Sequence, residues 1–111
     1  MKARLSTRAQ GDLDRIYAYL YTARGAKAAD AFLEQAQRAT AFIAQNPFAG
    51  PHPSWATRHR TLRFWVISGT RFLIFYIPEE KEISIERVLD GRRDVKRILE
   101  HAIEDPPENC E

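Results

Sequence analysis

The spacing of apolar residues changes once along this chain, near residue 61, and this change constrains the fold more than any other feature. Before it, apolar residues recur three and four positions apart, as on one face of a helix. After it, β-branched and aromatic residues alternate with other residues in short runs separated by turns. Helices and strands segregated in this way predict an α+β domain.

The helical part is predicted to be an antiparallel hairpin. Ser6 or Thr7 can cap a first helix, and Gly25 suits the left-handed residue that closes it. A second, alanine-rich helix is expected over residues 27–45, after a connection so short that the two helices must lie side by side. The apolar faces of the two helices comprise Leu13, Ile16, Tyr17 and Leu20 in the first, and Phe32, Ala36, Ala39 and Ile43 in the second.

Residues 2–5, 61–67, 71–77 and 82–89 are predicted strands, and the short turns between the last three favour antiparallel pairing. Strict alternation would place Ile83, Ile85, Arg87 and Leu89 on one face of the last strand. A short helix is expected from about Gly91, capped by Asp90. The predicted order is β-α-α-β-β-β-α: a helical hairpin packed on a mainly antiparallel four-stranded sheet, with a short C-terminal helix. Residues 1–103 are interpreted as a single domain and residues 104–111 as an acidic, disordered tail.

Composition excludes several classes of function. No apolar run approaches the roughly 20 residues of a membrane span, and no signal-peptide core is present, so a cytoplasmic protein is expected. The only cysteine, Cys110, can form no internal disulfide. The three histidines, His52, His59 and His101, lack metal-ligand spacing, so neither a metal nor a cofactor is expected. A net charge of +2 combines a basic body with an acidic C-terminus, a weak indication of an anionic partner.

Several short motifs occur in a fixed order, and together they resemble the RelE/ParE toxin superfamily. The motif residues are Asp12, Leu13, Ile16 and Tyr19; Asn46, Pro47 and Gly50; Leu62 and Arg63; Phe72, Ile74 and Tyr76; and Ile83, Ile85, Arg87, Val88, Leu89, Gly91, Arg93 and Asp94. The resemblance implies the toxin of a type II toxin–antitoxin pair. RelE-like members cut messenger RNA on the ribosome, whereas ParE-like members act on DNA gyrase and are neutralised by ParD-type antitoxins.

The two branches differ in chemistry. A RelE-like enzyme needs a proton carrier near its C-terminus, and the matching position here is Leu99, which cannot transfer a proton. His101 is two residues away and points elsewhere on a helix. Together with this missing proton carrier, the resemblance implies a ParE-like toxin that inhibits gyrase by binding, with no catalytic residues. Two alternatives stay open: a RelE-like nuclease using Arg63, Arg93 and His59, or a non-toxic module that binds an antitoxin.

Two sets of residues are candidates for binding partners. The candidates for contact with the target are Arg63, Arg87, Arg92, Arg93, Asp94 and Trp55. Arg63, Arg87 and Arg93 could form one cationic cluster for an acidic partner, although Arg87 could instead pair with Asp94 or Glu86. Trp55 could be an interface anchor or could hold its proline-rich loop in place. The candidates for antitoxin contact are Tyr17, Tyr21 and Phe42. No sequence-specific DNA binding is expected of the toxin alone.

Overall fold

The structure, a computed structural model, describes residues 1–104, with side chains as far as Leu99. Its elements follow the predicted order: β1 (Lys2–Leu5), α1 (Thr7–Arg24), α2 (Ala26–Gln45), β2 (Arg63–Val66), β3 (Phe72–Pro78), β4 (Glu82–Asp90) and α3 (Val95–Glu104). Of the predicted tail at residues 104–111, Glu104 ends α3, and residues 105–111, which include Cys110, lie outside the described residues, as does the side chain of His101.

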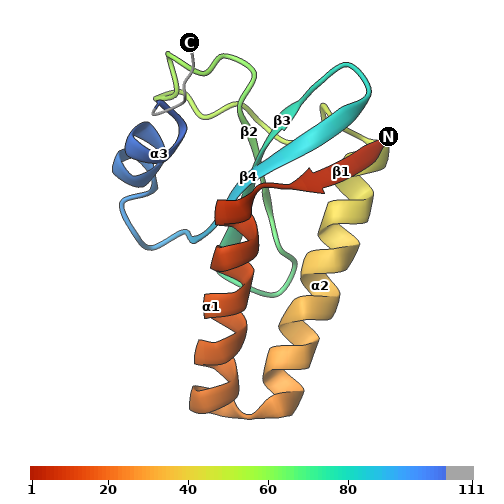
Figure 1. Ribbon diagram of the computed structural model, residues 1–111, viewed down its shortest axis with the longest axis vertical. Helices are drawn as coiled ribbons and strands as arrows, with labels where there is room; N and C mark the ends of the chain where they lie inside the picture. The colour runs from red at the N-terminus through yellow and green to blue at the C-terminus, as the bar shows by residue number, and fades with distance from the viewer. Residues whose placement is uncertain (105–111) are drawn as a thin grey trace.

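The helices α1 and α2 form the predicted antiparallel hairpin, which extends well below the sheet in Figure 1. The Ser6 hydroxyl oxygen accepts a hydrogen bond from the Ala9 amide at 3.0 Å, so Ser6 caps α1. Gly25 alone joins the helices. Its φ of 98° lies where a side chain would be strained, and its amide donates to the Tyr21 carbonyl. This position requires glycine, as the sequence predicted.

The four strands form one mixed sheet in the order β1-β4-β3-β2, with β1 parallel to β4 and the other pairs antiparallel. The hairpin covers one face, and α3 lies on the other side of the sheet (Figure 1). The main core joins the hairpin to Ile74, Tyr76, Ile83 and Ile85. A second core lies on the opposite face and comprises Ala56, Leu62, Phe75, Leu89 and Leu99. The central strand β3 is therefore covered on both faces.

The prediction that one face of β4 carries Ile83, Ile85, Arg87 and Leu89 is wrong. Ile83, Ile85 and Val88 pack in the main core, whereas Leu89 packs in the second. The register against β3 shifts between Phe75 and Tyr76, and it leaves Glu86 as an extra residue on β4. This bulge reverses the alternation after Ile85.

The predicted starts of β2 and of the last helix both differ from the structure. Leu62 precedes β2, and its amide donates to the His59 carbonyl and so closes a turn. The Leu62 side chain is fully buried. The last helix begins at Val95 and not near Gly91. Asp90 does accept from the Arg92 amide at 2.9 Å, but that bond closes a turn, and it is Asp94 that accepts from the Arg97 amide in the first turn of α3.

The long connection between α2 and β2 is held to the sheet by Tyr76. The buried Tyr76 hydroxyl donates to the Pro47 carbonyl at 2.8 Å and accepts from the Gly50 amide at 3.1 Å. A side chain at Gly50 would collide with the Phe64 carbonyl oxygen, so the loop can approach β2 this closely only with glycine. The loop is thereby a fixed part of the domain.

Candidate functional site

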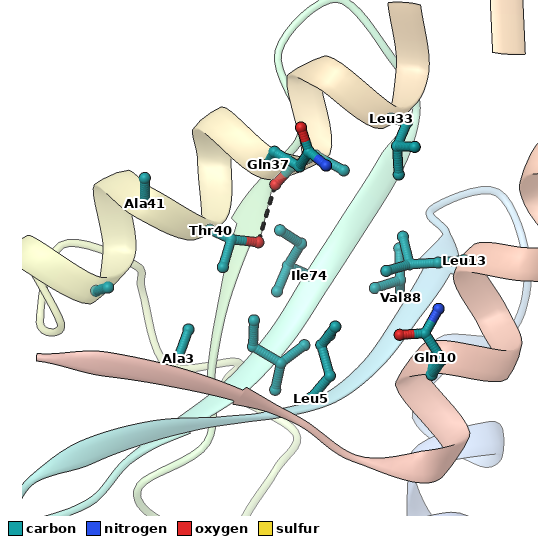
Figure 2. A pocket seen from close by; sticks show the side chains of 13 residues that line it. Ala3, Leu5, Gln10, Leu13, Leu33, Gln37, Thr40, Ala41, Ile74 and Val88 are labelled. Carbon is teal, nitrogen blue, oxygen red and sulfur yellow. Dashed lines mark hydrogen bonds between the residues drawn. The ribbon is translucent and has the colours of Figure 1, made fainter. Parts of the chain in front are cut away.

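An apolar groove of about 470 Å³ opens between the helical hairpin and the β1 side of the sheet (Figure 2). Its lining residues are Ala3, Leu5, Gln10, Leu13, Leu33, Ala36, Gln37, Thr40, Ala41, Ala44, Ile74, Ile85 and Val88. The buried Ile74, Ile85 and Val88 form its floor, and the exposed Leu5 and Ala41 lie at its rim. We call this feature the apolar groove.

The alanines of α2 explain why the groove is open. The lining residues Ala36, Ala41 and Ala44 each carry only a methyl group, so α2 leaves space above the sheet. The one hydroxyl in the middle of the groove, that of Thr40, donates to the Ala36 carbonyl at 2.9 Å and needs no other partner (Figure 2). A groove with satisfied polar groups and an apolar floor suits the apolar side chains of a partner segment.

A second cavity, of about 580 Å³, lies between α1, the junction of β3 and β4, and α3. Its lining residues are Asp12, Arg15, Ile16, Tyr19, Arg71, Phe72, Arg87, Val88, Leu89, Asp90, Arg92, Arg93 and Ile98. Five of these side chains are arginines and two are aspartates. We call this cavity the arginine pocket.

Asp12 organises one side of the arginine pocket. Its carboxylate is only 3% exposed and accepts two hydrogen bonds from Arg87, at 2.7 and 2.9 Å, and one from the Val88 amide at 2.9 Å. Arg15, one turn along α1, donates to the same carboxylate at 2.5 Å. The hydrogen bond to Asp12 raises the pKa of Arg87 against the opposing effect of burial. Arg87 therefore pairs across 75 residues of sequence, and the expected pairing with Asp94 or Glu86 is wrong.

Asp90 organises the other side. It accepts from Arg71 at 2.7 Å and from the Arg92 amide at 2.9 Å, with the Arg92 guanidinium at 3.5 Å. Burial raises the pKa of Asp90, but these hydrogen bonds outweigh it and lower the pKa from 3.8 to about 2. Each carboxylate of the pocket is thus shared by two arginines.

The depressed pKa of Asp90 predicts a pH-dependent loss of stability. The carboxylate form stabilises the fold above about pH 4, and this contribution disappears as the pH falls through about 2. Asp90→Asn should be less stable than the wild type by on the order of 1 kcal/mol at neutral pH, because Arg92 is exposed and screened by water. Urea unfolding of both proteins between pH 2 and 7 checks this, and a stability difference that stays constant over that range contradicts it.

Arg63 and Trp55 both hold the long connection. Arg63 donates to the carbonyls of Phe48 and Gly50, at 3.1 and 2.6 Å, and lies over the Phe48 ring. Trp55 packs on the second core, with its ring 6.5 Å from that of Phe75. Arg63 does not line the arginine pocket, so the expected cluster of Arg63, Arg87 and Arg93 is divided: the last two lie together and Arg63 lies apart.

Leu99 is 1% exposed and packs in the second core. His59 lies beside it, around a cavity of only about 20 Å³ that Trp55 also lines. The His59 Nε2 atom is buried and has no hydrogen-bond partner among the described residues. His59, Arg63 and Arg93 share none of the cavities described above.

The three aromatic candidates for antitoxin contact lie outside the apolar groove. Tyr17 donates to Asp30 at 2.6 Å, and its ring lies 6.3 Å from that of the exposed Tyr21. Phe42 is 43% exposed and stacks on Trp65 at 4.9 Å. Trp65 packs against the main core.

Sequence reasoning missed the roles of Arg15, Arg71 and, above all, Asp12. A signal for Asp12 was present, because it lies three residues after the buried Ala9 and four before Ile16, on the inward face of α1. A carboxylate at such a position needs a buried partner. Nothing in the local sequence shows that this partner is Arg87.

No metal site and no membrane helix occur in the part of the chain that the structure describes. Residues 1–104 contain no group of His, Cys, Asp and Glu able to hold a metal ion. Within the same residues, no helix is long and apolar enough to cross a bilayer.

The fold is that of a small toxin of the RelE/ParE superfamily. A solved structure with the same fold is a chain of the chromosomal ParDE TA system from P. aeruginosa, with a TM-score of 0.67 and 21% sequence identity. The match covers 79% of this chain and 92% of that one. No curated protein gives a significant sequence match. The family model of the ParE toxin of the type II toxin–antitoxin system parDE matches residues 3–95, and the chain belongs to this family.

Proposed function

We propose that this type II toxin inhibits DNA gyrase by binding it in the cytoplasm, without breaking bonds itself, and that a ParD-type antitoxin neutralises it. One observation carries the proposal: Leu99 is sealed in the second core at the position where an RNA-cutting relative keeps a proton carrier. A leucine there offers no acid or base to a bound substrate.

The apolar groove is the proposed site for the antitoxin. Its floor of Ile74, Ile85 and Val88 can take the apolar side chains of a segment that folds on contact. The exposed rings of Tyr21 and Phe42 lie on the same helical hairpin and could extend that interface, with Tyr17 beside Tyr21.

The arginine pocket, with Arg87, Arg92 and Arg93, is the proposed contact with the target. Asp94 adjoins it at the start of α3, where it accepts from the Arg97 amide. Arg63 and Trp55 support this role from outside the pocket, by holding the long connection to the sheet.

Two assays on purified protein test the proposal. Gyrase supercoiling should be inhibited in proportion to added toxin, and prior addition of the antitoxin should restore it. In a translation reaction, messenger RNA should stay intact at the same toxin concentration. Cuts in ribosome-bound RNA would support the nuclease alternative instead. Tight antitoxin binding with no effect in either reaction would support the non-toxic module.

A further inference from the structure

We infer that the arginine pocket binds phosphate groups, supplied either by a nucleic-acid backbone or by a free nucleotide. The inference deepens the proposed function, since it rests on the use of this pocket for target contact. It concerns the toxin alone, however, and can be tested without gyrase.

The first argument is charge. Arg15, Arg71, Arg87, Arg92 and Arg93 line one concave surface together with only two carboxylates, so positive charges exceed negative ones by three. Self-contained ion pairing would need a carboxylate for each guanidinium. A cleft with one dominant sign of charge focuses its field outward and attracts oppositely charged ligands.

The second argument is the graded exposure of the arginines. The side chains of Arg87 and Arg71 are 14% and 32% exposed and form the floor, where Asp12 and Asp90 hold them in place. Arg15 and Arg92 are 69% and 72% exposed and form the rim. A floor fixed in advance lowers the ordering cost of binding, and an exposed rim leaves guanidinium groups within reach of what binds.

Among the five arginines of the pocket, Arg93 has the most side-chain hydrogen-bond donors without a partner in the described part of the chain. Its backbone amide donates to the Asp90 carbonyl, but its guanidinium makes no hydrogen bond or ion pair with any residue in the described part of the chain. All five of its N–H donors are available to a ligand.

The third argument concerns the class of ligand. Guanidinium groups donate pairs of parallel hydrogen bonds to phosphate oxygens, and a terminal phosphate offers more acceptors and more charge than a carboxylate. At about 580 Å³ the pocket is larger than one phosphate needs. Tyr19, whose side chain is 58% exposed at the pocket, offers a flat surface for an attached sugar or base.

The test measures binding of two probes to the full-length toxin: inorganic pyrophosphate by calorimetry, and a short labelled DNA duplex by fluorescence anisotropy. Arg93→Ala should weaken binding of whichever probe the pocket takes by roughly tenfold, because charge-assisted hydrogen bonds are lost. Arg38→Ala is the matched control. It removes the same charge from an exposed position on α2 where the arginine pairs with Glu34, outside the pocket, and should leave affinity within about twofold.

Binding of pyrophosphate alone identifies a free nucleotide as the source, and binding of the duplex identifies the backbone. The inference is overturned if neither probe binds, or if Arg38→Ala weakens binding as much as Arg93→Ala does. It is also overturned if polyglutamate binds as tightly as the phosphate probes and is equally sensitive to Arg93→Ala. Phosphate binding without gyrase inhibition would refute the proposed function only, and gyrase inhibition without phosphate binding would refute this inference only.

Discussion

Asp12→Ala is expected to lower the free energy of unfolding by about 3–5 kcal/mol, which is the range observed when one partner of a buried ion pair is removed. The substitution leaves the Arg87 guanidinium, 14% exposed, without its carboxylate, and it removes the acceptor of the buried Val88 amide. Both losses act in the same direction, because a largely buried charge and a buried donor each lose a hydrogen-bond partner.

Urea unfolding monitored by circular dichroism measures this change. The matched control is Asp14→Ala, two residues along α1, because Asp14 is exposed and accepts a hydrogen bond from the Gln10 side chain. That control should stay within about 0.5 kcal/mol of the wild type. A second variant combines Asp12→Leu with Arg87→Met and should recover much of the loss, since it removes both charges together. If Asp12→Ala were as stable as Asp14→Ala, the ion pair would not contribute to the fold in solution.

Ala41→Arg is expected to weaken antitoxin binding by about a hundredfold or more. Ala41 lies at the rim of the apolar groove, and an arginine there would place a long cationic side chain where the partner buries apolar residues. The toxin itself should keep its stability, because Ala41 is exposed and arginine is nearly as good a helix former as alanine.

Titration of the cognate antitoxin against purified toxin measures the affinity, and growth of cells expressing both proteins gives a second readout. Ala31→Arg provides the control, since Ala31 is also an exposed alanine of α2 but does not line the groove. Cells with Ala41→Arg should stop growing despite the antitoxin, whereas cells with Ala31→Arg should be protected. Equal affinity of the two variants would place the antitoxin elsewhere on the surface.

The order of elements was predictable because it depends on interactions between near neighbours in the chain. The Ser6 cap and the Gly25 break each involve residues within about one helical turn. The start of α3 was misplaced for a related reason. Asp90 and Asp94 are both able to cap, and only the observed hydrogen bonds show that Asp90 closes a turn and Asp94 serves the helix.

The candidate site depends on contacts that no local pattern encodes. The sequence by itself determined the helical hairpin, the three C-terminal strands, the final helix and the apolar residue at position 99. Only the tertiary structure decided that Asp12 meets Arg87, that Arg71 joins Arg93 in one pocket, and that the alanines of α2 leave a groove above β4. The physical reason is that periodicity fixes which face of an element is buried, whereas the packing of that face against distant elements fixes which side chains meet.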